Sequence, residues 1–193
     1  MPLPPLGLDM DGVICTPFLG TNMAISRQLG LPPLPELSHV RDVTGQRRHA
    51  YLRLRRRWEF LRYMGRHPLP GVREGLQELR RLRQLVLITG RSWHARQIIE
   101  RWLAKYELAQ YFAEVLPNTT NLSTAHYKLW TVSRLGIREH IDDDGSIACY
   151  LASHNIHVFL TDWPRNLGLP YPEGVTRIRR LADAARALHQ QVL

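Results

Sequence analysis

The stretch Leu6-Gly7-Leu8-Asp9-Met10-Asp11-Gly12-Val13 is a short apolar run that passes into two acids and a glycine. Such a run predicts a strand that ends near Asp9, and Gly12 predicts a turn directly after it. Asp9 and Asp11 are two residues apart, so in a continuing strand their side chains point to the same face. One carboxylate could then attack as a nucleophile while the other moves a proton. The alternative is an acidic loop that binds calcium or nothing.

Three further motifs follow in order along the chain. Thr89-Gly90-Arg91 ends the apolar run Leu85-Val86-Leu87-Ile88, and Asp142-Asp143-Asp144 ends another predicted strand. Between them, Lys128 lies in the first turns of a predicted helix and is one of only two lysines. Strand ends at one edge of a parallel sheet converge on a shared crevice, so these groups can meet there. Carboxylates, a hydroxyl and an ammonium group in one place suit phosphoryl transfer assisted by a hard divalent cation.

Strand and helix patterns alternate along the chain. This alternation indicates an α/β fold with a parallel sheet flanked by helices. Strands are predicted near residues 6–9, 85–89, 112–116, 140–142, 156–160 and 175–178, and helices near residues 70–82, 93–106, 124–135, 145–153 and 181–192.

A long insertion separates the first strand from the second. The helix near 70–82 leads directly into the second strand, so we predict a core domain of residues 1–14 and 71–193 and a small helical cap of residues 15–70. The cap contains a basic helix near residues 46–64, which includes Arg47, Arg48, Arg53 and an apolar stripe with Trp58. Its arginines could meet an anionic substrate, although a solvated helix face is the more ordinary interpretation.

Each later motif also has a structural interpretation. A hydroxyl and backbone amides at Thr89-Gly90-Arg91 suit a phosphate oxyanion, but Thr89 or Ser92 could simply cap a helix. Lys128 could be a solvated surface lysine. Three consecutive acids repel one another unless a cation such as Mg²⁺ relieves the repulsion, but they could also form a polar turn and a helix cap.

Taken together, the four motifs resemble those of the haloacid dehalogenase (HAD) superfamily of phosphohydrolases. The resemblance covers residues 1–14 and 71–193, with all four motifs in order. It implies a Rossmann-like parallel sheet with a cap inserted after the first strand. It also implies Mg²⁺-dependent hydrolysis of a small phosphorylated substrate through a phosphoaspartyl intermediate.

The resemblance also implies a role for each motif residue. Asp9 would be the nucleophile, and Asp11 the general acid for the leaving alcohol and then the base for water. Thr89, Gly90, Arg91 and Lys128 would bind the substrate, with Thr89 and Lys128 also catalytic. An acid must be protonated at the start, so we expect the pKa of Asp11 to be raised.

The metal ligands are implied in the same way. Asp9, the backbone carbonyl of Asp11, and Asp143 would bind Mg²⁺, with Asp142 assisting. Asp143 is the first choice among the three consecutive acids, and the spacing alone leaves that choice open.

One segment resembles a branch of the superfamily. The stretch Phe159-Leu160-Thr161-Asp162-Trp163-Pro164-Arg165-Asn166 is similar to a segment of the small 5'-nucleotidases and deoxyribonucleotidases, and so is the start Asp-Met-Asp-Gly-Val. This resemblance implies a nucleotide substrate, or otherwise another small phosphorylated metabolite. The chain departs from the branch in having Thr-Gly-Arg at the second motif and no recognisable cap signature.

Composition limits the remaining possibilities. The net charge of +9 allows a phosphatase that acts on nucleic-acid ends, but a general excess of arginine is the preferred interpretation. No apolar run reaches the roughly 20 residues that span a bilayer, so no membrane association is expected. Without a signal peptide and with two cysteines, the expected setting is cytoplasmic. A homodimer and a non-catalytic phosphate-binding domain are further possibilities.

Overall fold

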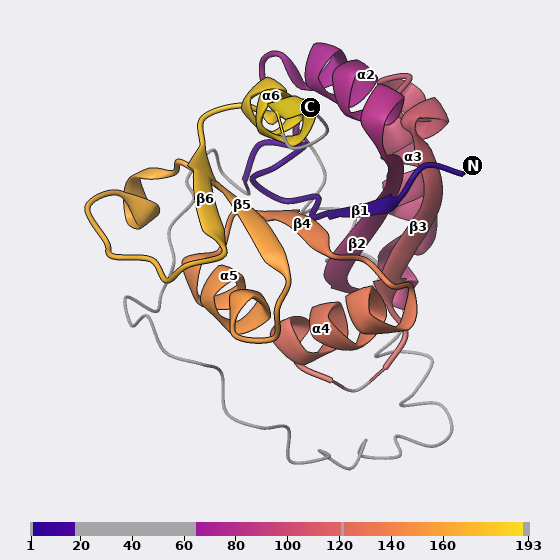
Figure 1. Cartoon of the computed structure of the whole chain (residues 1–193). Coiled ribbons are helices and arrows are strands. Elements are labelled where there is room, and N and C mark those ends of the chain that lie inside the picture. Colours follow the sequence, from indigo (N-terminus) through magenta and orange to yellow (C-terminus); the bar gives the residue numbers. More distant parts are fainter. Residues whose placement is uncertain (1, 18–64, 121, 191–193) are drawn as a thin grey trace.

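The computed structural model describes residues 2–17, 65–120 and 122–190 (Figure 1). The predicted basic helix at residues 46–64, with Arg47, Arg48, Arg53 and Trp58, lies outside the described residues. The cap boundary at 15–70 is therefore only partly within them, and the cap stays a prediction.

A six-stranded sheet with parallel pairing throughout forms the centre of the described structure, in the order β3-β2-β1-β4-β5-β6. Its strands are β1 (Pro5–Leu8), β2 (Gln84–Ser92), β3 (Phe112–Asn118), β4 (Glu139–Asp142), β5 (His157–Thr161) and β6 (Val175–Ile178). The order reverses direction at β1 and β4, which is the point where open α/β sheets bind ligands. The first and last acidic motifs follow these two strands.

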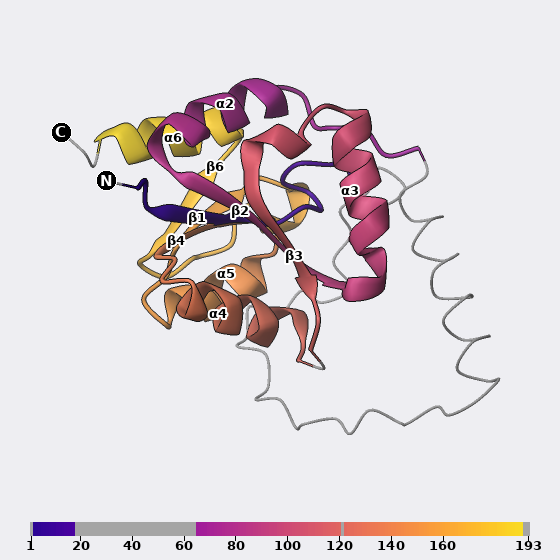
Figure 2. The same cartoon turned by 90° about the vertical axis from the view of Figure 1, so that its right-hand side faces the viewer.

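Helices cover both faces of the sheet (Figures 1 and 2). The helices α2 (Val72–Leu82), α3 (Arg96–Lys105) and α6 (Leu181–Gln190) lie on one face, and α4 (Thr124–Arg134) and α5 (Gly145–Ala152) lie on the other. Short 3₁₀ turns are η2 (Trp93–Ala95), η3 (Ala109–Tyr111) and η4 (Pro164–Asn166). None of the helices within the described ranges has the length and apolarity to cross a bilayer.

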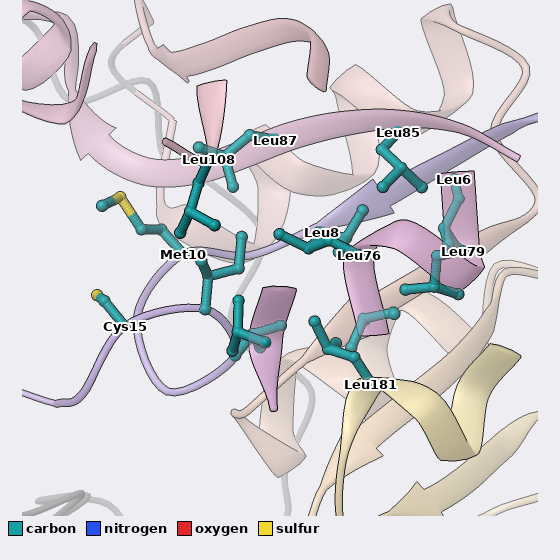
Figure 3. Packing of buried hydrophobic residues seen from close by; sticks show 14 of the residues in the cluster. Leu6, Leu8, Met10, Cys15, Leu76, Leu79, Leu85, Leu87, Leu108 and Leu181 are labelled. Carbon is teal, nitrogen blue, oxygen red and sulfur yellow. The ribbon is translucent and has the colours of Figure 1, made fainter. Parts of the chain in front are cut away.

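The side chains of β5 show how the two cores form. Phe159 belongs to the core under α2 and α6, whereas Val158 and Leu160 belong to the core under α4 and α5. Alternate residues of a strand face opposite sides, so a continuous apolar run fills both cores. Figure 3 shows the first core, where leucines of β1 and β2 pack near leucines of α2 and Leu181.

The predicted elements agree with the observed ones except around the second motif. Strand β2 continues to Ser92, three residues past Thr89, because Ser92 pairs with Asn118 after a register shift. The helix predicted near 93–106 consequently begins as the turn η2, and α3 starts at Arg96. The side chain of Ser123 caps α4 by accepting from the backbone N–H of His126.

The two ends of the insertion lie side by side near the end of β1. The backbone N–H of Thr16 donates to the carbonyl of His67 at 2.9 Å, and that of Leu69 donates to the carbonyl of Ile14 at 2.9 Å. These bonds hold residues 66–69 against the loop that carries Asp11.

Candidate active site

Three carboxylates meet at the carboxyl end of the sheet. One oxygen each of Asp9, Asp142 and Asp143 lies within 4.8 Å of the others, and all three residues are buried. Asp9 follows β1, while Asp142 ends β4 and Asp143 follows it. The switch in strand order therefore brings the first and fourth motifs together, as the sequence predicts.

Lys128 joins this acidic cluster from the face covered by α4. Its Nζ lies 2.7 Å from Oδ2 of Asp142 and 3.2 Å from Oδ2 of Asp9, and the side chain is 1% exposed. Burial alone would lower the pKa of Lys128, but the carboxylates of Asp142 and Asp9 outweigh it and raise the pKa. The lysine is therefore a fixed positive charge inside the site, and the surface interpretation is wrong.

Asp142 is the most firmly held of the three acids. Its Oδ1 accepts the backbone N–H groups of Asp143 and Asp144 at 2.9 and 3.1 Å, and its Oδ2 accepts from Lys128. Burial alone would raise the pKa of Asp142, but Lys128 and His140 outweigh it and hold the pKa below its usual range. Asp142 is thus an ionised anchor that fixes the turn after β4.

His140 approaches the same carboxylate from within β4. Its Nε2 lies 3.2 Å from Oδ2 of Asp142, because residues two apart in a strand share a face. Gly7, its partner on β1, makes room for the ring: a Cβ there would lie 2.3 Å from Nδ1 of His140. Sequence reasoning missed His140, although the spacing His-x-Asp is a usable signal.

The third consecutive acid has its hydrogen-bond donors at the start of α5. Asp144 caps α5, where its Oδ1 accepts the backbone N–H groups of Ser146 and Ile147 at 2.8 and 3.2 Å. The helix-cap interpretation therefore holds for Asp144, and the acidic cluster interpretation holds for Asp142 and Asp143.

The segment after β5 holds Asp143 in place. Arg165 Nη2 donates to the carbonyl oxygen of Asp143 at 2.7 Å and to its Oδ2 at 2.9 Å. Asn166 Nδ2 donates to the same carbonyl and to that of Thr161, both at 2.9 Å. The sequence indicates this segment only through its resemblance to nucleotidases, and it does not predict that the segment contacts the acids.

Burial and mutual repulsion of the carboxylates make added positive charge favourable at the acidic cluster. Burial raises the pKa of Asp9 to about 7, with Asp142 and Asp11 adding to the shift and Lys128 opposing it. Burial also raises the pKa of Asp143, and Asp9 and Asp142 add to that shift. A cation at the three carboxylates would relieve both effects.

Asp11 differs sharply from Asp9. Arg91 donates to both of its carboxylate oxygens, from Nε at 2.7 Å and from Nη2 at 2.9 Å, and Arg66 forms a further ion pair with Oδ1. Burial would raise the pKa of Asp11, but the two arginines outweigh it and lower the pKa to about 2. The expectation of a raised pKa is therefore wrong for this arrangement, because the partners of Asp11 are cations and not Asp9.

The second motif lies on β2, next to the strand that leads to Asp9. Thr89 is 1% exposed, and its Oγ1 accepts the backbone N–H of Arg91 at 3.3 Å. A Cβ at Gly90 would lie 2.3 Å from Cγ2 of Thr124, so a glycine is needed where β2 passes the start of α4. The Arg91 side chain reaches Asp11, an orientation that sequence spacing does not indicate.

Arg66 is the other residue that sequence reasoning missed. It lies near the end of the insertion, yet its side chain is 5% exposed and reaches an acid 55 residues earlier. It also donates to Sγ of the buried Cys15 at 3.5 Å. No motif surrounds it, so only the folded arrangement reveals it.

The donor set fits a divalent cation such as Mg²⁺. The acidic cluster presents three buried carboxylate oxygens close together, and oxygen is the ligand atom that Mg²⁺ prefers. The raised pKa values of Asp9 and Asp143 show that these groups are not fully compensated by Lys128 and Arg165.

Comparisons with known proteins extend these observations. No protein-family model and no curated protein sequence matches the chain. Solved structures do match. A HAD-superfamily hydrolase of subfamily IA from Geobacter sulfurreducens has a TM-score of 0.56 at 18% identity, over 96% of this chain and 99% of that one.

Two further structures have a TM-score of 0.61. One is a candidate phosphoglycolate phosphatase from Lactobacillus plantarum, 12% identical, over 96% of this chain and 99% of that one. The other is a candidate HAD hydrolase from Bacillus subtilis bound to magnesium, 14% identical, over 98% of this chain and 100% of that one. The matches, together with the parallel sheet, show that this chain has the fold of the HAD-superfamily hydrolases.

Proposed function

We propose that the protein is a phosphomonoester hydrolase that works through a phosphoaspartyl intermediate on Asp9. The observation that carries this proposal is the contact of Asp9 with Lys128 inside the cluster completed by Asp142 and Asp143. A nucleophilic carboxylate can approach an anionic phosphate only where positive charge offsets the repulsion. The buried ammonium of Lys128 supplies part of that charge.

The reaction divides into two displacements at phosphorus. An oxygen of Asp9 attacks, the bond from phosphorus to the ester oxygen breaks, and the departing alcohol takes a proton from the Asp11 carboxyl. Water then attacks the phosphoaspartate, gives a proton to Asp11, and releases phosphate with Asp9 restored. Because Arg66 and Arg91 lower its pKa, Asp11 favours the ionised form, which accepts the proton from water. For the first displacement Asp11 must carry a proton, which the two arginines oppose.

Mg²⁺ would be held by Asp9, Asp143 and the backbone carbonyl of Asp11, with Asp142 anchoring the turn. When bound, the ion supplies positive charge that offsets the charges of the carboxylates and the phosphate. The magnesium bound to the Bacillus structure supports this choice of metal.

Thr89, Gly90, Arg91 and Lys128 complete the proposed substrate site. Thr89 and the amide of Gly90 would hold phosphate oxygens at the end of β2, next to Lys128. Arg91 would border the same site from its position on Asp11.

For the substrate, we favour a nucleoside monophosphate or another small phosphorylated metabolite. The segment Trp163-Pro164-Arg165-Asn166 supports the nucleotide, because the stretch that resembles nucleotidases contacts the site through Asp143. The experiment below also distinguishes a nucleic-acid-end phosphatase and a non-catalytic phosphate-binding domain. A homodimer is a separate proposal.

The test is phosphate release from a panel of esters with and without Mg²⁺. The panel contains nucleoside and deoxynucleoside monophosphates, sugar phosphates and a 3'-phosphorylated oligonucleotide. We expect Mg²⁺-dependent release that disappears in Asp9→Asn and persists in the control Glu78→Gln, an exposed acid on α2. Binding of phosphate by a folded protein without release from any ester would contradict the proposal and favour the non-catalytic domain.

A further inference from the structure

Arg66 connects the end of the insertion to the acid that moves the proton. Its guanidinium forms an ion pair with Oδ1 of Asp11 and is almost fully buried. Arg91 approaches the same carboxylate from β2 and contacts both oxygens. Two guanidinium groups from separate segments therefore determine the orientation of one carboxylate.

The backbone of Arg66 is itself fixed by α3. Trp102 Nε1 donates to the Arg66 carbonyl at 3.2 Å, and Tyr106 Oη donates to it at 3.0 Å. The rings of Trp102 and Tyr106 lie against each other, with centroids 4.9 Å apart. A carbonyl that accepts from two packed aromatic residues has little freedom to move.

The next residue is held as well. His67 donates its backbone N–H to Oγ1 of Thr16 at 3.2 Å, and its carbonyl accepts the Thr16 N–H at 2.9 Å. Arg66 is therefore anchored on the helix side through its carbonyl and on the loop side through its neighbour. Its side chain extends from a rigid base to Asp11.

We propose that Arg66 is a positioning residue that, with Arg91, aims the Asp11 carboxyl at the leaving oxygen, and that Trp102 and Tyr106 set the position of Arg66. This inference rests on the proposed function. Paired guanidinium and carboxylate groups fix geometry as well as charge. The charge of Arg66 lowers the pKa of Asp11 and so opposes its protonation, which means that Arg66 helps the reaction only if its effect on geometry is the larger one. Proton transfer depends on that geometry, because the carboxyl must lie within hydrogen-bond reach of the departing oxygen.

The leaving group of the ester provides the test. A p-nitrophenolate leaves without needing a proton, whereas an alkoxide depends on one from Asp11. We would measure kcat/KM, which reports the steps up to phosphoenzyme formation, for p-nitrophenyl phosphate and for alkyl phosphates of increasing leaving-group pKa. The enzymes are the wild type, Arg66→Gln, Arg66→Lys and Tyr106→Phe.

For Arg66→Gln we expect kcat/KM on alkyl phosphates to fall about 10- to 100-fold, part of the 10²- to 10⁴-fold that general acid catalysis supplies. On p-nitrophenyl phosphate it should change by less than about threefold. Tyr106→Phe should show the same selectivity with a smaller fall. The control Arg73→Gln should show no change, because Arg73 Nη2 contacts the backbone carbonyl of Tyr106 and not its hydroxyl.

Equal losses on both kinds of ester, in Arg66→Lys and Tyr106→Phe as well as in Arg66→Gln, would mean a general structural role and would overturn the proposal. So would an unchanged leaving-group dependence in all three variants, or a gain on alkyl phosphates in Arg66→Gln, which would mean that the charge of Arg66 outweighs its effect on geometry. If Arg66→Gln does not fold, Arg66→Lys and Tyr106→Phe decide the matter. A folded wild type that hydrolyses no ester would instead reject the proposed function, and this inference with it.

Discussion

Trp163 donates its Nε1–H to the carbonyl oxygen of Gly12 at 2.7 Å, which joins residues 151 positions apart. The hydroxyl of Thr161 reaches the same oxygen at 3.3 Å. The turn after Asp9 is therefore held from the end of β5. On its other side, the space that a Gly12 side chain would occupy is filled by the carboxylate of Asp143. The first acidic motif, the fourth and the Trp163 segment form one packed unit.

Replacement of Gly12 should disrupt this unit. Gly12 has φ of 72°, and a Cβ there would lie 2.2 Å from Oδ2 of Asp143. Gly12→Ala therefore pays about 1 kcal/mol of backbone strain and also displaces a candidate metal ligand. We expect Mg²⁺ affinity, measured by calorimetry, to fall at least tenfold. Gly136→Ala is the control, since Gly136 has φ of 64° with no atom within 4 Å of the added Cβ. Equal Mg²⁺ affinities of the two variants would contradict this expectation.

Trp163→Phe removes one hydrogen-bond donor and keeps most of the apolar ring. Because Gly12 retains the weaker bond from Thr161, the free energy of unfolding should fall by about 1 kcal/mol, measured by urea denaturation. The proposed phosphatase activity should also fall, by more than the small loss of folded protein can explain, because the Gly12 turn carries Asp11. The control is Trp93→Phe, whose ring is 56% exposed. If Trp163→Phe and Trp93→Phe lose the same stability and the same activity, the hydrogen bond from Trp163 to Gly12 makes no specific contribution.

The sequence predicts where the backbone of several site residues lies, but it does not predict where their side chains point. The ends of β1 and β4 follow from apolar runs that stop at polar residues, so the location of Asp9 and Asp142 is predictable. The apolar run before Thr89 places that residue on β2, although the strand continues to Ser92. Their convergence follows from parallel strand order alone. Lys128 is predictable for the same reason, since its helix precedes β4 and covers the neighbouring face.

The direction of individual side chains is not predictable in this way. Three consecutive acids look equivalent in sequence, yet Asp142 binds Lys128, Asp143 binds Arg165, and Asp144 caps α5. Lys128 and Arg165 come from outside the acidic motif, whereas the cap formed by Asp144 is local to the start of α5. The pKa of Asp11 shows the same limit, because its low value comes from Arg66 and Arg91, distant in sequence and close in space.

Lys128→Met should damage both stability and activity. It would leave Asp142 and Asp9 buried without their cation, and breaking a buried ion pair in this way costs about 3–5 kcal/mol. We expect the midpoint of urea unfolding to drop strongly and phosphate release to disappear. Lys105→Met is the matched control, because Lys105 is the other lysine and is exposed. A Lys128→Met protein of unchanged stability would show that the ion pairs contribute little.

Asp9→Asn should abolish turnover and yet stabilise the metal-free protein above neutral pH. The pKa of Asp9 is about 7 in the folded chain against 3.8 as the ordinary value, so the folded state keeps a proton that the unfolded state loses. The stability from that proton is complete below about pH 4 and is lost as the pH rises to about 7. A shift of this size corresponds to about 4 kcal/mol, shared in part with Asp143.

Urea unfolding in the presence of a chelator at about pH 5 and about pH 8 measures this effect. The wild type should lose stability between the two conditions, and Asp9→Asn should lose markedly less, so that the variant is the more stable protein at about pH 8. Added Mg²⁺ should restore the wild type, because a ligand that binds only the folded state stabilises it. If Asp9→Asn is no more stable than the wild type at about pH 8 without metal, repulsion within the acidic cluster is not a significant cost. The electrostatic reason for a cation at this cluster would then be lost.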